Sequence, residues 1–138
     1  MTYPFCGTNI LIRLITGGDP KKQDRAIALF EQVEQGILTL TAPDTVIADA
    51  VFVLTPKRLY AIPRKEVADR LTTLVRLPHF HVKNRRAVLR ALQLVGTTTH
   101  LDFGDAVLIA LMQLSGEHMI YSYDSDFDRL PVISRQEP

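Results

Sequence analysis

Apolar residues recur at helical spacing through most of this chain, and short alternating runs separate the helical stretches. Apolar positions three or four residues apart predict helices over residues 10–16, 21–35, 43–54, 62–77, 85–95 and 101–115. Short runs rich in apolar and β-branched residues predict strands at residues 3–6, 38–42, 80–82, 119–123 and 132–134, with a turn at 126–130 before the last. Short strands separated by helices predict an α/β fold with a short-stranded, mostly parallel central sheet covered by helices on both faces.

The length and the absence of repeats or linkers predict a single domain over residues 1–138. The one cysteine, Cys6, excludes an internal disulfide and a multi-cysteine zinc site, and it fits a reducing cytoplasm. Cys6 stands between Phe5 and Gly7, where a cysteine is more often a small core residue than a nucleophile. The sequence shows no secretory signal and no apolar run long enough for a membrane span, so we expect a cytoplasmic protein with no membrane partner.

Charge changes this picture, because seven of the fifteen carboxylates lie beyond residue 100 while only two basic residues, Arg129 and Arg135, do. Carboxylates crowded beside apolar segments repel one another and lose hydration unless they protonate, pair with bases or share a cation. A shared divalent metal is the simplest explanation. Ligands that are all oxygens point to Mg²⁺ or Mn²⁺ as the cofactor.

The middle of the chain is basic. Residues 57–90 hold ten Lys or Arg against two acidic residues, although the net charge of the whole chain is only +1. A basic face beside an acidic metal site would suit an RNA backbone, and Arg64, Lys65, Arg85 and Arg86 are the candidates to line it. Ordinary surface charge on solvated helix faces explains the same residues. For a basic run taken alone, this is the more frequent interpretation.

Candidate site residues follow the predicted strands, because sites of open α/β sheets form where loops leave the carboxyl ends of strands. Residues 7–9 follow the first strand, Asp105 lies near the start of a long helix, and Ser122 and Asp124 end the fourth strand. Asp49 lies in the apolar run 46–53, where a carboxylate is costly unless it reaches a cation or a donor.

Four segments in this order, residues 8–17, 43–54, 101–110 and 121–131, make the sequence similar to a PIN domain ribonuclease toxin of the VapC type. The resemblance spans residues 3 to about 134. It implies a three-layer α/β/α PIN-like fold and a metal-dependent endoribonuclease that hydrolyses RNA. It also implies a VapB-like antitoxin as partner, bound in a hydrophobic groove between the early helices with an arginine toward the acidic pocket, and a homodimer.

Carried onto this sequence, the resemblance implies catalytic and metal-binding roles for Asp49, Asp105 and Asp124. Supporting roles fall to Asn9, Ser122 and Asp126. The chain departs from the family pattern at two positions. Asp49 replaces a usual Glu and shortens the side chain by one methylene. Gly7 stands where the family has the Asp of its Asp-Thr-Asn signature, so one carboxylate ligand is missing.

The missing carboxylate predicts weaker metal binding and slower RNA cleavage, because several converging carboxylates retain Mg²⁺. Three explanations of Gly7 stay open: an evolved loss, compensation by Asp126 or Asp128, and a change engineered or selected during cloning of a toxic protein. The sequence therefore carries two hypotheses, an impaired ribonuclease toxin and a catalytically inactive PIN domain that retains antitoxin or RNA binding.

Several polar residues have structural interpretations as well. Asp102 is expected to cap the helix that follows it. Asp126 and Asp128 are expected to be cap and surface residues. His79 and His81 are two isolated histidines, which is weak evidence for zinc. Arg13 either extends its guanidinium to solvent or pairs with a site carboxylate.

Overall fold

The computed structural model describes residues 1–138 and contains all of the predicted helices, with ends shifted by a few residues. They are α1 (Thr8–Ile15), α2 (Pro20–Glu34), α3 (Asp44–Leu54), α4 (Arg64–Val75), α5 (Arg85–Thr97) and α6 (Phe103–Ser115). The strands are β1 (Leu40–Ala42), β2 (Phe80–Val82), β3 (Met119–Tyr121) and β4 (Ser134–Gln136), and a 3₁₀ helix, η1 (Ser125–Arg129), precedes the last. The prediction of a helix-rich α/β fold with short parallel strands is confirmed.

Local capping signals explain where two of the helices begin. Asp19 precedes α2 and its carboxylate accepts a hydrogen bond of 3.2 Å from Lys22 N–H, while Pro20 occupies the first helical position. Asp102 caps α6 as predicted, since its carboxylate accepts from Asp105 N–H at 2.8 Å. After α6 the chain turns at Gly116, whose φ of 78° is a left-handed conformation that favours glycine.

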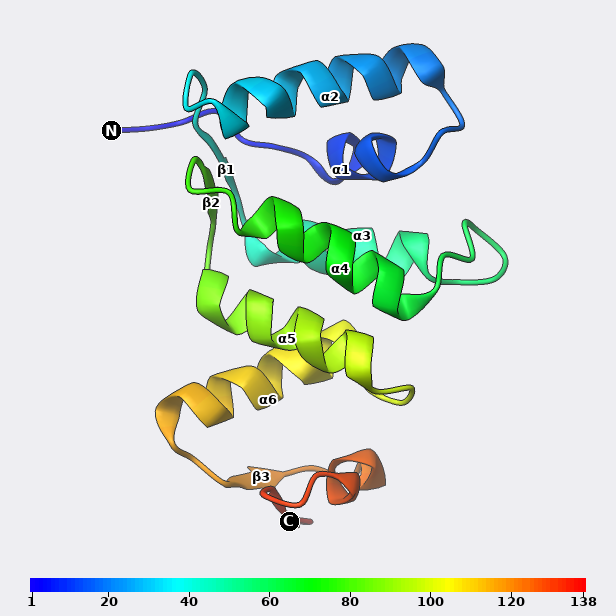
Figure 1. Cartoon of the computed structure of the whole chain (residues 1–138). Coiled ribbons are helices and arrows are strands. Elements are labelled where there is room, and N and C mark those ends of the chain that lie inside the picture. Colours follow the sequence, from blue (N-terminus) through cyan, green and yellow to red (C-terminus); the bar gives the residue numbers. More distant parts are fainter.

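The strands form two separate sheets instead of the single central sheet that the sequence predicted. β1 pairs with β2 and β3 pairs with β4, both in parallel. Helices α3 to α6 lie in successive layers between α1 and α2 at one end of the molecule and β3 at the other (Figure 1). Residues that follow the first and fourth predicted strands are therefore held apart within one chain.

Two predicted strands differ from the observed ones for backbone reasons. The run 3–6 makes only a bridge between Phe5 and Thr41, because Pro4 contributes its carbonyl to Thr41 but has no N–H to donate. The last strand begins at Ser134 and not at residue 132, because Ile133 N–H donates to Leu130 O in the turn after η1.

A single apolar core runs through the molecule and includes Cys6, of which 3% is exposed. Burial raises the pKa of the Cys6 thiol to about 11, so the thiol is not poised to act as a nucleophile. The prediction that Cys6 is a core residue is confirmed. None of the helices combines the length and the apolar character needed to cross a membrane.

Candidate functional site

Helix α3 lies at the centre of the candidate site because it packs against both α1 and α6. Its buried face consists of Ile47, Ala50, Val51 and Leu54. Asp49 lies on the exposed face, so the burial cost that the sequence analysis assigned to a carboxylate in this apolar run does not arise. It lines a shallow groove of about 360 Å³ together with Arg64 and Asp102.

An acidic corner forms where α6 begins. We use this name for Asp102, Asp105, Asp124 and Asp126. Burial raises the pKa of the Asp105 carboxyl, and the negative charges of Asp102, Asp124 and Asp126 raise it further. None of the ion pairs in the molecule involves these four residues or Asp49. The corner is a group of carboxylates whose charge no side chain of the protein neutralises by contact.

The turn after β3 fixes Asp124 through backbone hydrogen bonds. Its N–H donates to Ser122 Oγ at 3.0 Å, and its carboxylate accepts from Asp126 N–H at 2.9 Å. Asp124 therefore caps η1, and the expectation that Asp126 is a cap residue is wrong. Ser122 holds the turn that orients Asp124, which is a structural basis for the supporting role expected of it.

Asp128 is held by Arg135. The guanidinium donates from Nε and Nη2 to both carboxylate oxygens at 2.8 and 3.0 Å, and this pairing lowers the pKa of Asp128. The expectation that Asp128 is a surface residue fits this exposed pair. Its engagement with Arg135 leaves Asp126, which is half-buried beside Asp105, as the remaining candidate to compensate for Gly7.

Gly7 is the residue that precedes α1, with φ −85° and ψ 162°, and it gives the helix no side-chain cap. A Cβ at this position would meet no atom within 4 Å, so a larger residue fits without strain. Within the chain, α1 packs on α2 and α3 and lies far from β3 (Figure 1). The division of the sheet separates Gly7 from Asp124, so the expected single pocket is not preformed.

The residues of the acidic corner fit a divalent ion in the kind of donor they offer but not in their spacing. No three acidic, histidine or cysteine side chains converge closely enough to hold one ion. The donors are all carboxylate oxygens, which Mg²⁺ and Mn²⁺ prefer, and their mutual repulsion favours a cation. Asp105 and Asp124, whose charges interact, are the residues that would hold it, and Asp49 lines the neighbouring groove together with Asp102.

Two arginines expected to contact RNA instead bind backbone carbonyls. Arg64 donates from Nε to the carbonyls of Val95 and Thr98 at 3.2 Å, and from Nη2 to that of Leu101. Arg85 donates from Nη2 to Leu77 O at 3.0 Å and to the carbonyl of Phe80. Their guanidinium groups tie the ends of neighbouring elements together, which gives both arginines a structural role.

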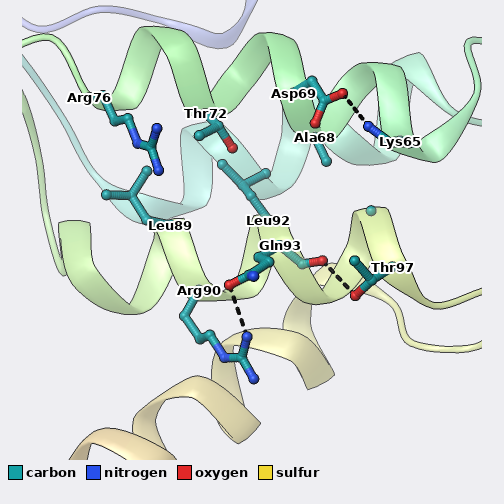
Figure 2. A pocket seen from close by; sticks show the side chains of 11 residues that line it. Lys65, Ala68, Asp69, Thr72, Arg76, Leu89, Arg90, Leu92, Gln93 and Thr97 are labelled. Carbon is teal, nitrogen blue, oxygen red and sulfur yellow. Dashed lines mark hydrogen bonds and ion pairs between the residues drawn. The ribbon is translucent and has the colours of Figure 1, made fainter.

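Arg86, another candidate for RNA contact, is exposed, and a further accessible basic surface lies in a groove of about 480 Å³ between α4 and α5. Lys65, Arg76 and Arg90 line it, and Figure 2 shows all three at its walls together with Thr72 and Gln93. Lys65 pairs with Asp69 at 2.8 Å, but both side chains are largely exposed, so the pair leaves the charge accessible.

A second groove, of about 530 Å³, lies between α1 and α2. The apolar residues Ile10, Ala26 and Leu29 line it, as expected of a groove between the early helices. Its remaining lining residues are Asn9, Arg13, Lys22 and Arg25. Arg13 makes no ion pair within the chain, and the groove is suited to an occupant with negative charge.

Neither histidine of the β2 region contributes to a metal site. His79 Nδ1 shares a hydrogen bond of 3.2 Å with Thr39 Oγ1, and the ring of His81 packs edge-on against Tyr3 with centroids 5.2 Å apart. Both therefore have local structural roles.

Taken together, these observations define an α/β domain that presents uncompensated carboxylates at the start of a helix and at the end of a parallel strand. The family model of the PIN domain matches residues 5–133, which is nearly the whole chain, and the protein belongs to the PIN domain family. PIN domains are generally metal-dependent nucleases, so membership assigns a nuclease-type hydrolase function at that coarse level. No protein of curated function matches the chain.

The raised pKa of Asp105 predicts how stability depends on pH. The folded state holds this proton more tightly than the unfolded chain does, so the stability contribution of Asp105 falls as the pH rises above its ordinary pKa of 3.8. We expect Asp105→Asn to raise the free energy of unfolding at neutral pH by on the order of 0.5 kcal/mol, as is typical of exposed charges. Urea unfolding of both proteins at acid and neutral pH measures this. An equal gain at both pH values would show that charge repulsion is not the cause.

Proposed function

We propose that this PIN domain is an endoribonuclease toxin of a VapBC-type toxin–antitoxin system, impaired by glycine at its first acidic position. One observation carries the proposal: within a PIN domain, the carboxylates predicted from the sequence include a group in which burial and mutual repulsion raise the pKa of Asp105. Groups with perturbed pKa values gather at functional sites.

The chain's own residues have distinct roles in the proposed reaction. Asp105 and Asp124, with Asp49, would hold Mg²⁺ or Mn²⁺. When bound, the ion would supply charge stabilisation at the phosphate and favour formation of the nucleophile. Ser122 and the backbone of Asp126 orient Asp124 through the two hydrogen bonds of the η1 turn. Asn9, exposed on the first turn of α1, would contact the phosphate or its water.

Gly7 supports a second candidate function, a PIN domain that binds its antitoxin or RNA without cleaving it. The position offers no carboxylate, and Asp128, one of its two possible substitutes, is engaged by Arg135. Both candidates have the same fold and the same binding partners. Only catalytic rate and metal affinity separate them.

A VapB-like antitoxin is the proposed protein partner, since an arginine on it would find the acidic corner free of intramolecular ion pairs. The groove between α1 and α2, expected to seat the antitoxin, is more basic than the hydrophobic groove predicted, so the proposed contact is the one between an antitoxin arginine and the acidic corner. A titration of acidic-corner variants with the antitoxin from the neighbouring gene tests this, and we expect Asp105→Asn to weaken binding.

Cleavage of single-stranded RNA by the purified chain tests the proposed activity. We expect slow cleavage with Mn²⁺ or Mg²⁺, none with a chelator, and none after Asp105→Asn in the presence of metal. The matched control is Glu34→Gln on α2, since Glu34 is exposed and makes no ion pair, and it lies in neither the acidic corner nor the groove between α4 and α5. Cleavage that survives both the chelator and Asp105→Asn would contradict the proposal. No cleavage under any condition favours the binding function.

RNA binding is expected to depend on the groove between α4 and α5. Replacing Lys65, Arg76 and Arg90 with Gln should weaken binding and lower the slope of log affinity against log salt by about 0.7 per lost phosphate contact. Filter binding across salt concentrations measures the slope. Lys21→Gln with Lys57→Gln removes exposed charges outside the groove and serves as the control. An unchanged slope in the groove variant would show that its charges only face solvent.

A further inference from the structure

Two parallel strand pairs in this molecule each end at an open edge. The N-terminal segment, residues 4–6, bonds to Thr41 on one side, with Cys6 N–H donating to Thr41 O and Thr41 N–H to Pro4 O. β3 pairs only with β4. Each has a second edge whose backbone groups pair with no strand of this chain. Such edges bind readily to another strand.

Both open edges carry exposed apolar side chains. Phe5 is 77% exposed, while on β3 Tyr121 is 64% and Met119 is 41% exposed. On α6, Leu108, Leu111 and Leu114 are also exposed, at a spacing of three. Parallel sheets are rarely left uncovered, and two strands alone make a marginal sheet. The surface around β3 thus has the character of an interface.

The chain does not close these edges on itself. α3, α4, α5 and α6 lie between the N-terminal segment and β3 (Figure 1), and no contact between α1 and η1 or β3 appears among the main packing interactions. Both edges are therefore open to a strand supplied from outside, and a second copy of the chain carries the complementary edge for each.

Charge favours a second copy over an unrelated strand. Residues 7–9 follow the N-terminal segment and lead into α1, where Arg13 lines the basic groove with Lys22 and Arg25. Asp124 follows β3 within the acidic corner. Parallel pairing aligns the carboxyl ends of two strands, so the acidic corner of one copy would face the basic groove of the other. None of these charges is paired within the chain.

We propose that two copies of this chain associate reciprocally, with β3 of each pairing in parallel with the N-terminal segment of the other. The arrangement has the twofold symmetry of a closed dimer, with two equal junctions. It places the partner's Asp124 beside Gly7 and Arg13, so that residues which one chain keeps apart meet at the junction. The completion of a metal site at the junction rests on the proposed nuclease function. The strand pairing does not depend on that function.

Disulfide cross-linking between two different variants tests the pairing directly. In a Cys6→Ala background, chains with Phe5→Cys are mixed with chains carrying either Met119→Cys or Tyr121→Cys and oxidised mildly. We expect one of the two mixtures to give a covalent heterodimer of about twice 15.5 kDa. Ile37→Cys, at a site 70% exposed in the loop before β1, replaces Phe5→Cys as the control and should not cross-link.

A chain carrying Phe5→Cys together with the cross-linking β3 substitution separates the alternatives. A covalent dimer supports the proposal. A cross-linked monomer would show that the chain closes on itself and would overturn the proposal. The proposal would also be overturned if light scattering gave a monomeric mass for the unmodified chain and neither mixture formed a cross-link. Circular dichroism confirms that each variant is folded. None of these results depends on RNA cleavage, so failure of the pairing and failure of the nuclease proposal are distinguishable.

Discussion

RNA cleavage is expected to rise by on the order of 10²- to 10³-fold when Gly7 is replaced with aspartate. A metal ion contributes several kcal/mol of transition-state stabilisation, and each 1.36 kcal/mol is about tenfold in rate. In the proposed dimer Gly7 lies beside the partner's Asp124, so restoring one ligand there recovers part of that contribution. The backbone at Gly7 is extended and open space surrounds its Cβ position, so aspartate is accommodated without repacking. Initial rates of RNA cleavage at fixed Mn²⁺ measure the gain.

The companion variants make this result specific. Gly7→Asn has nearly the same size as Gly7→Asp and also caps α1, but it lacks the charge, so it should leave the rate low. Gly7→Asp combined with Asp105→Asn should be inactive and harmless to growth, whereas Gly7→Asp alone should arrest growth unless the antitoxin is present. If the unmodified chain already cleaves RNA as fast as Gly7→Asp does, then Asp126 has taken over the missing role.

Arg64→Met is expected to lower the free energy of unfolding by about 2–3 kcal/mol, because it leaves carbonyls of Val95, Thr98 and Leu101 without their charged donor. Methionine keeps most of the apolar stem, so packing is largely conserved. For a domain of this size the loss corresponds to a decrease of roughly 6–12 °C in Tm. Differential scanning calorimetry measures it.

Arg58→Met is the matched control for Arg64→Met. Arg58 is exposed in the segment before α4, so its loss should change Tm little. If Arg64→Met had the same Tm as Arg58→Met, the three carbonyl contacts of Arg64 would add nothing to stability. Arg64 would then be available to RNA, as the sequence analysis expected.

Features fixed by near neighbours in sequence could be predicted. Asp102 caps α6 through an N–H only three residues away, and the helices follow from apolar spacing that is visible within each segment. Cys6 lies among apolar neighbours and is buried. The carboxylates after residue 100 could be recognised as an acidic group because so few basic residues accompany them. Their negative charges, together with burial, do raise the pKa of Asp105.

Features that depend on distant backbone groups could not be predicted. The carbonyls bound by Arg64 lie 31 to 37 residues away, and no pattern in the sequence marks them. Strand order is equally hidden, because the short apolar runs predict strands but not which edges pair. The division into two sheets, and with it the separation of Gly7 from Asp124, is a property of the tertiary arrangement alone.

Mn²⁺ binding by isothermal titration tests the central claim most directly, that Asp49, Asp105 and Asp124 bind one divalent ion although a single chain does not preform the site. In the Gly7→Asp background, Asp49→Asn, Asp105→Asn and Asp124→Asn are each expected to weaken Mn²⁺ binding by about tenfold or more, since each removes a charged oxygen ligand. Asp69→Asn, outside the site, should leave the affinity unchanged. Equal Mn²⁺ affinities in the three site variants and their parent would contradict the assignment of these carboxylates as the metal site.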